Sequence, residues 1–362
     1  MSATASVSAD EARELLVDLV SIPSPSGEEA AAAERLADFV AAHDREVWID
    51  EVGNVRAPAD DAVLLTSHVD TVPGEVPVEI DEDGGPSETD RDGAGETGEV
   101  LWGRGSVDAT GPLAAMAAAA VRAGVSFVGV VGEETDSRGA RHLIEDRDAP
   151  DAVVNGEPSG FDGITLGYRG FLSGTYVATS ESGHTSRPEP NAIQDGIRWW
   201  SRVEAAFDPD EWEPVFEQVT TKPVSVEGGF TADGLSVETT MDVQLRIPPE
   251  RTAEAVREVA DGELESGTVT WEDPIPPVMT SPRSEVARAF RAAIRQEGGD
   301  PRLLRKTGTS DMNLYATAWD CPMATYGPGD SDLDHAPNEH VALGEFDRSV
   351  AVLESVAEDL KP

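Results

Sequence analysis

Cysteine and long apolar runs are nearly absent from this chain of 362 residues. It has 1 cysteine, Cys321, so no internal disulfide can form, which is typical of a reducing compartment and predicts a cytoplasmic location. The N-terminal segment carries neither a basic region nor an apolar core, so we expect no signal peptide. The longest apolar stretch, residues 111–132, is mostly alanine and is broken by Arg122, so it predicts a buried helix and a strand rather than a membrane span.

Positive charge is also scarce, because 27 Lys and Arg residues stand against 70 Asp and Glu residues, a formal net charge of −43. At low salt such a surface repels itself strongly. At about 1 M salt the Debye length falls to roughly 3 Å and the repulsion largely vanishes. The sequence therefore predicts a soluble, halophilic protein from a very salty cytoplasm. The same acidity argues against nucleic acids and anionic membranes as partners.

Alternating strands and helices indicate an α/β fold in the first part of the chain. Ser8 and Glu11 form the pattern of a capping box before a helix, and an alanine-rich helix is expected at 28–42. Strands are expected at residues 47–55, 63–67, 125–131 and 152–154, and a helix at Thr110. Residues 81–99 are acidic and low in complexity, which predicts a solvated loop.

The pattern changes near Gly167, where an inserted α+β module is expected. Its predicted strands are 171–180 and 234–247, and its predicted helices are 192–207 and 249–262. A helix at 284–296 and a C-terminal helix from Glu345 then return to the first pattern. We therefore expect a metal-binding catalytic domain of residues 1–166 and 276–362, interrupted by an inserted domain of residues 167–275.

Two adjacent glutamates end the apolar strand in VSFVGVVGEETDSRG, residues 125–139. The β-branched run is typical of a strand that is covered on both faces. Glu133 and Glu134 follow where the strand opens into a loop. Two like charges at this place would be stabilised by nearby cations.

Further candidate metal ligands stand at strand ends and helix starts. A strand leads into His68-Val69-Asp70, and side chains at i and i+2 of an extended segment share one face. His68 can therefore bind a metal while Asp70 orients its imidazole. Asp108 in GRGSVDATGP, Glu157 in VNGEPSG and His335 in SDLDHAPNEH complete the set.

Imidazoles and carboxylates without thiolates suit zinc, cobalt or manganese. His68, Asp108, Glu157 and His335, with one glutamate of the pair, supply more ligands than one tetrahedral ion needs, and two ions that share one carboxylate would use them all. The other glutamate of the pair would then be free to accept a proton from the attacking water as a general base. Spacing alone does not decide which glutamate has which role.

Each candidate also has a purely structural interpretation. Asp108 could cap the helix that follows it, the paired glutamates could lie on a solvated face, and Glu157 could belong to an ordinary loop. A single His-x-Asp sequence is mostly structural. The remaining histidines lack the context of a strand end, so we expect structural roles for His43, His142 and His340.

With these motifs the sequence resembles the dinuclear-zinc amidohydrolase family of acetylornithine deacetylase, succinyl-diaminopimelate desuccinylase and carboxypeptidase-like exopeptidases. The matching segments are SHVDTVP, GRGSVDATGP, VGEETDSRG, NGEPSG, SGHTSRP, MDVQLRIPP and the C-terminal histidine. The resemblance implies a zinc-exopeptidase-like α/β domain, in which a mixed sheet is flanked by helices, and an inserted lid or dimerisation domain.

The resemblance also implies a role for each candidate. Asp108 would bridge two divalent ions, Zn²⁺ or Co²⁺. His68 and Glu157 would complete one site, and Glu134 and His335 the other. Glu133 would be the general base, and Asp70 would support His68.

Within the family, ITLGYRG and KTGTSDMN…YGPGDSDLDHAPNEH look most like hydrolases that free lysine or ornithine from an amino-group carrier protein. This implies a role in lysine and arginine biosynthesis, an acidic carrier protein as substrate and a homodimer. The acidic segment 81–99 departs from the family pattern. Rival interpretations are an acetylornithine deacetylase or a dipeptidase with the same site, and a non-catalytic metal-containing binding protein.

Two residues of the inserted module complete the implied site. His184 of SGHTSRP resembles the donor that stabilises the oxyanion, supplied in cis or by a partner subunit, and Arg246 of QLRIPP resembles an arginine that holds a substrate carboxylate. The structural alternatives are a histidine satisfied within its own strand and a surface ion pair. The segment Thr309-Ser310-Asp311 would shape the pocket or only turn the chain.

Overall fold

The computed structural model describes residues 7–82, 98–184, 186, 188–209 and 211–362, so most of the acidic segment predicted as a loop lies outside the described residues. The chain divides into two compact units. The first comprises Met1–Leu166, Thr280–Leu304 and Ser310–Pro362, and the second comprises Gly167–Met279 and Arg305–Thr309. The short segment 305–309 returns to the second unit, which no sequence pattern indicated.

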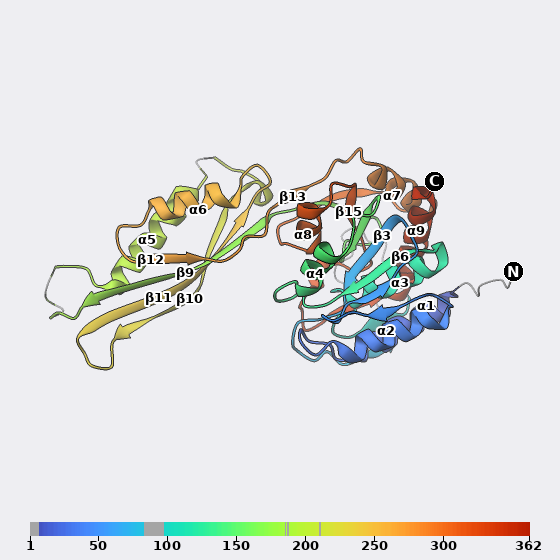
Figure 1. Ribbon diagram of the computed structural model, residues 1–362, viewed down its shortest axis with the longest axis horizontal. Helices are drawn as coiled ribbons and strands as arrows, with labels where there is room; N and C mark the ends of the chain where they lie inside the picture. Colours follow the sequence, from blue (N-terminus) through green and yellow to red (C-terminus); the bar gives the residue numbers. More distant parts are fainter. Residues whose placement is uncertain (1–6, 83–97, 185, 187, 210) are drawn as a thin grey trace. The chain divides into compact units, whose positions relative to one another are not determined.

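A mixed sheet forms the centre of the first unit (Figure 1). Its strands lie in the order β1 (Trp48–Ile49), β2 (Val55–Ala57), β6 (Val125–Val130), β3 (Asp60–His68), β7 (Val153–Gly156), β15 (Met323–Thr325) and β8 (Gly163–Tyr168). The inner strands β6, β3, β7 and β15 are parallel, and the pairs β1–β2, β2–β6 and β15–β8 are antiparallel. Every residue of β6 is buried, as its continuous apolar sequence predicts.

Two further strands pair with β8 along the same sheet. They are β13 (Val278–Met279), opposite Tyr168 and Gly167, and β14 (Arg302–Lys306).

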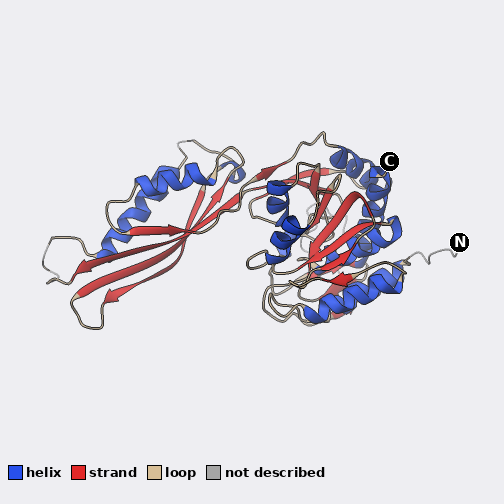
Figure 2. Ribbon diagram, in the orientation of Figure 1, coloured by secondary structure: helices blue, strands red, loops and turns tan. Residues whose placement is uncertain are grey.

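Helices flank this sheet (Figure 2). They are α1 (Ala9–Val20), α2 (Ala30–Ala42), α3 (Thr110–Ala123), α4 (Arg138–Asp146), α7 (Glu285–Gln296), α8 (Asp311–Ala318) and α9 (Leu343–Leu360). Ser8 and Glu11 form the predicted capping box at the start of α1. Helix α3 is rich in alanine and packs against α1, α9 and β3, because its small side chains permit close approach on several sides.

A small antiparallel sheet lies beside the large one in the same unit. Its strands follow the order β16 (His340–Ala342), β5 (Val100–Trp102) and β4 (Glu79–Asp81). The short helical turn η2 (Ser331–Leu333) precedes β16. The strands β5 and β16 matter for the site, because the chain continues from β5 towards Asp108 and reaches β16 from His335.

The second unit is an antiparallel sheet with two helices against it. Its strands follow the order β10 (Thr220–Phe230), β11 (Ser236–Ile247), β9 (Gly170–Glu181) and β12 (Thr268–Trp271). The helices are α5 (Ala192–Phe207) and α6 (Ala253–Gly262), with the short turn η1 (Val215–Glu217) before β10. The core contains Tyr176 stacked on Trp199, with ring centroids 4.9 Å apart.

Strands β10 and β12 were not predicted from the sequence. Most of β10 is exposed and its pairing shifts between Pro223 and Ser225, so it lacks the alternation that marks a half-buried strand. The helix predicted at 249–262 begins at Ala253, after the cap of Thr252. The C-terminal helix begins at Leu343, before the predicted Glu345.

No helix in the described part of the chain is both long and apolar enough to cross a membrane.

Candidate metal centre

Five predicted ligands converge in two overlapping clusters in the first unit. One cluster is His68, Asp108 and Glu157, and the other is Asp108, Glu134 and His335. Within each cluster the ligand atoms lie within 4.8 Å of one another. Asp108 belongs to both.

The sheet explains this convergence. His68 ends β3, Glu134 follows β6 and Glu157 follows β7, and these three strands are parallel neighbours. The carboxyl ends of parallel strands meet at one edge, so the three side chains reach the same place. Asp108 precedes α3, and His335 comes from the segment before β16.

Asp108 lies between the two imidazoles. Its Oδ1 is 3.1 Å from His68 Nε2, and its Oδ2 is 3.2 Å from His335 Nε2. His335 Nε2 is also 3.2 Å from Glu134 Oε1. The hydrogen bond with Asp108 raises the pKa of His335 to about 9. Burial alone would raise the pKa of Asp108, but hydrogen bonds from His335 and His68 bring it below its usual value.

The other carboxylates of the centre are poorly solvated. Burial raises the pKa of Glu157 well above its usual value and raises that of Glu134, and the charge of Asp108 adds to both effects. A buried group of carboxylates that oppose each other's ionisation is stabilised by nearby positive charge. Oxygen and nitrogen donors without sulfur therefore fit two hard or borderline divalent cations, with His68 and Glu157 on one, Glu134 and His335 on the other, and Asp108 on both.

Glu133 belongs to neither cluster among the described residues. Burial raises the pKa of its carboxyl well above the usual value, and the charges of Asp311, Glu134 and Asp108 raise it further. A carboxylate with a raised pKa is a better proton acceptor at neutral pH. The two adjacent glutamates therefore differ in their surroundings, because Glu134 belongs to one cluster and Glu133 belongs to neither.

Asp70 holds both the histidine and the glutamate pair. The imidazole Nδ1 of His68 donates to the backbone carbonyl of Asp70 at 2.8 Å, which directs Nε2 into the cluster. The carboxylate of Asp70 is 3.7 Å from Nδ1 and accepts instead from the backbone N–H of Glu133 and of Glu134, both at 3.1 Å, and from Ser26 Oγ at 2.6 Å. The hydrogen bond to His68 is thus made by the backbone carbonyl of Asp70 and not by the carboxylate that the sequence predicted.

The turn after β6 needs a glycine. Gly132 has a φ of +78°, and its carbonyl accepts from Thr135, Asp136 and Ser137 N–H at 3.3, 3.1 and 2.6 Å. A Cβ at this position would also lie against the guanidinium of Arg138. The tight turn therefore presents Glu133 and Glu134 together at the strand end.

Asp311 is a carboxylate of the centre whose role the sequence left open. It begins α8, and it is 2% exposed. Burial raises its pKa to about 7, and the charge of Asp70 adds to the shift. Its Oδ1 has no hydrogen-bond partner among the described residues. Asp311 therefore adds a buried oxygen without a hydrogen-bond partner, and its charge acts on both Glu133 and Glu157.

The two candidates of the inserted module belong to the second unit. His184 is exposed, and its Nδ1 is 2.8 Å from Ser186 Oγ. Arg246 on β11 lies over the ring of Phe171, 4.6 Å from its centroid, and Nη1 donates to Thr309 Oγ1 at 3.2 Å. The clusters of the first unit are thus complete without either residue.

The remaining histidines have local partners. His43 Nδ1 is 2.9 Å from the carbonyl of Phe39, His142 Nε2 is 3.9 Å from Asp50, and His340 stacks on Trp102 with centroids 4.3 Å apart. None of the three belongs to a described cluster.

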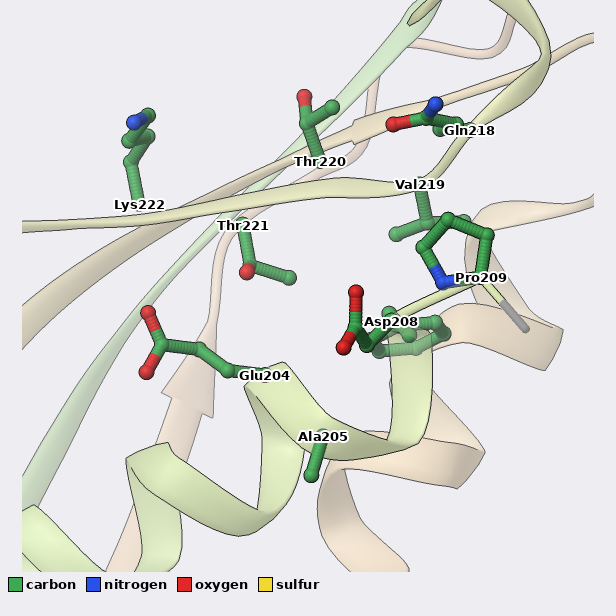
Figure 3. Close-up of a pocket in the computed structure, with 10 residues that line it drawn as sticks. Glu204, Ala205, Asp208, Pro209, Gln218, Val219, Thr220, Thr221 and Lys222 are labelled. Atoms are coloured by element: carbon green, nitrogen blue, oxygen red, sulfur yellow. The ribbon is translucent and has the colours of Figure 1, made fainter. Parts of the chain in front are cut away.

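A cavity of about 390 Å³ lies in the second unit, between the end of α5 and the start of β10 (Figure 3). Glu204, Asp208 and Lys222 are among its lining residues. It contains none of the predicted site residues, so the site is defined by the two clusters and not by this cavity.

Comparison with known proteins identifies a family and a fold that extend over nearly the whole chain. Residues 64–359 match the model of peptidase family M20/M25/M40. The chain is 38% identical to the LysW-lysine hydrolase of Deinococcus radiodurans over 96% of each protein. It is 29% identical to the LysW-lysine/LysW-ornithine hydrolase of Sulfurisphaera tokodaii, over 92% of this chain and 91% of that protein. An M20 family metallo-carboxypeptidase from Sulfolobus solfataricus has a similar fold, with a TM-score of 0.76 and 18% identity over 97% of this chain and 99% of that one.

Proposed function

The chain belongs to peptidase family M20/M25/M40 and is a metal-dependent hydrolase of amide bonds, and from this premise we propose that it releases lysine or ornithine from the terminal glutamate of an amino-group carrier protein. The chemistry rests on one observation, the two clusters that share Asp108 while Glu133 stays outside both. The substrate rests on the similarity to the Deinococcus and Sulfurisphaera enzymes along almost their entire length. The pathway would be lysine biosynthesis, and arginine biosynthesis where ornithine is the product.

The proposed ligands are His68 and Glu157 for one cation, Glu134 and His335 for the other, and Asp108 for both. Zn²⁺ and Co²⁺ suit this set. When bound, two such cations polarise the substrate carbonyl and lower the pKa of the attacking water. The Asp70 carboxylate accepts hydrogen bonds from the backbone N–H of Glu133 and of Glu134 and so keeps the backbone that carries them in place.

Glu133 is the proposed general base. It accepts a proton from the water as the water oxygen attacks the carbonyl carbon, and it then donates that proton to the nitrogen as the carbon–nitrogen bond breaks. The products are the free amino acid and the carboxylate of the carrier's glutamate. Burial keeps the carboxyl pKa of Glu133 high, which suits both the acceptance and the return of the proton.

Two residues of the second unit have proposed roles towards the substrate. His184 would donate a hydrogen bond to the developing oxyanion, from its own chain or from a partner subunit of a homodimer. Arg246 would hold the α-carboxylate of the leaving amino acid, because a guanidinium binds a carboxylate in a bidentate manner. Stacking on Phe171 and the contact with Thr309 hold the guanidinium in place.

The deciding experiment compares kcat/KM for carrier-linked lysine, carrier-linked ornithine and acetylornithine. All three are assayed at molar salt with Zn²⁺ or Co²⁺ added, and Glu133→Gln serves as the control for contaminating hydrolases. We expect the carrier-linked substrates to be preferred. If acetylornithine or a dipeptide is turned over equally well, the carrier assignment is rejected and only the amide hydrolase remains.

A further inference from the structure

Glu339 is a fully buried carboxylate to which the proposed chemistry gives no role. It is 0% exposed. Its Oε1 accepts from the backbone N–H of Val107 at 3.0 Å and from that of Asp108 at 3.1 Å. Its Oε2 accepts from Arg104 Nη1 at 2.6 Å. One side chain therefore holds the backbone of the shared ligand.

The small sheet brings Glu339 to this position. Strands β5 and β16 are antiparallel, with His340 opposite Trp102. Gly103 N–H donates to the carbonyl of Glu339 at 3.3 Å, so the two segments stay together beyond the strand ends. One segment leads from β5 to Asp108, and the other leads from His335 to β16. The side chain of Glu339 reaches from the segment before β16 to the segment that leads from β5 to Asp108.

We propose that Glu339 is a positioning residue that sets the distance between Asp108 and His335, and thereby the affinity of the cluster Asp108–Glu134–His335 for its cation. Two N–H groups converge on one charged oxygen, and such charge-assisted hydrogen bonds are shorter and stronger than neutral ones. They fix the backbone of Asp108 and so the direction of its side chain. The inference rests on the metal assignment proposed above.

The two clusters should respond differently. His335 lies on the same segment as Glu339, whereas His68 ends β3 and Glu157 follows β7. Loss of Glu339 lets the His335 segment move relative to Asp108, while the strand ends keep their places in the sheet. The site with His335 should therefore weaken more than the site with His68.

A buried carboxylate that joins two segments could also serve stability alone, and Glu345 offers a matched control. Glu345 on α9 accepts from the N–H of Phe161 at 3.1 Å and of Gly329 at 3.0 Å through its Oε1. It too joins two segments of the first unit. Neither N–H belongs to a proposed ligand.

The test titrates the metal-free wild type, Glu339→Gln and Glu345→Gln with Zn²⁺ by calorimetry at molar salt, and measures the Tm of each metal-free protein. Removal of residues that orient metal ligands typically weakens binding about 10–100-fold. We expect a loss of this size at one of the two sites in Glu339→Gln and a smaller loss at the other. We expect unchanged affinities in Glu345→Gln, even if its Tm falls by as much as the Tm of Glu339→Gln.

Cobalt absorption assigns the weakened site, because His335→Ala should remove the same signal that Glu339→Gln weakens. Wild-type affinities at both sites in a folded Glu339→Gln protein would overturn the proposal, as would selective loss of the site with His68. A wild type that binds no cation would instead reject the metal assignment itself. If Glu339→Gln does not fold, Arg104→Met loosens the carboxylate from its other side, and an unchanged affinity in that variant would equally overturn the proposal.

Discussion

Three buried carboxylates of the first unit and one carboxylate of the second unit have pKa values that are shifted in opposite directions. In the first, burial raises the pKa values of Glu133, Glu134 and Glu157. In the second, hydrogen bonds from Ser225 and Thr175 lower the pKa of Asp242, which is half-buried on β11. The pKa of the same chemical group is thus raised by burial in one place and lowered by hydrogen bonds in the other.

This difference separates the candidate site from the many other carboxylates of a chain of net charge −43. Surface carboxylates interact mainly with water and salt ions, and none of them alone indicates chemistry. Buried carboxylates that lack partners of opposite charge are the ones that a cation would stabilise. Burial, and not the number of acidic residues, identifies the candidate site.

Removal of the metal ions should have the largest effect on turnover and Tm, because it acts only on the buried carboxylates of the first unit. We expect dialysis against a chelator to abolish turnover and to lower the Tm, since a site filled at 100 times its Kd contributes about 2.7 kcal/mol to the free energy of unfolding. Zn²⁺ or Co²⁺ should restore both, and Mg²⁺ at the same concentration is the control. Full activity after verified loss of all bound metal would contradict the proposed centre.

The second-largest effect is expected for Glu133→Gln. This variant should reduce kcat about 10²–10⁴-fold while both cations stay bound, because only the general base is lost. The measurements are kcat and metal content. Asp242→Asn, at the hydrogen-bonded carboxylate of the second unit, is the control and should leave kcat unchanged. An emptied metal site in Glu133→Gln would instead exchange the roles of Glu133 and Glu134.

His184→Ala should reduce kcat by about 10²–10³-fold and change KM less, as expected for a donor to the oxyanion. Steady-state kinetics of the variant check this, and an unchanged kcat would remove His184 from the mechanism. If the donor comes from a partner subunit, mixing His184→Ala chains with Glu133→Gln chains should restore part of the activity. No recovery after confirmed subunit exchange would assign the donor to the same chain.

Lowering the salt concentration should have the smallest effect for each carboxylate, because it weakens the screening of all the exposed carboxylates together. At about 0.05 M salt the Debye length lies between roughly 10 and 30 Å, so the surface charges repel one another across the molecule. We expect activity and compactness to fall there and to recover near about 1 M salt. Activity and light scattering measured across this range provide the check, and full activity of a monodisperse protein at low salt would contradict it.

Much of the fold could be predicted because its signals are local. Ser8 with Glu11 determines the start of α1, and the continuous apolar run of β6 marks a strand covered on both faces. The predicted helix 192–207 coincides with α5, whose capping box is formed by Asn191 and Gln194. Strand β10 was missed because most of its side chains are exposed, so no alternation records which face is buried.

The sequence by itself determined the set of candidate ligands, because most of them stand at the end of a strand or the start of a helix, and parallel strands bring their carboxyl ends to one edge. Spacing left their division open and the family resemblance only implied one, whereas the tertiary structure places Asp108 in both clusters, Glu134 in one and Glu133 in neither. It alone showed the carbonyl of Asp70 on His68 and the carboxylate of Glu339 on the backbone of Asp108. Those contacts join residues through backbone atoms or across 231 positions of sequence, and neither kind of contact leaves a periodic pattern in the chain.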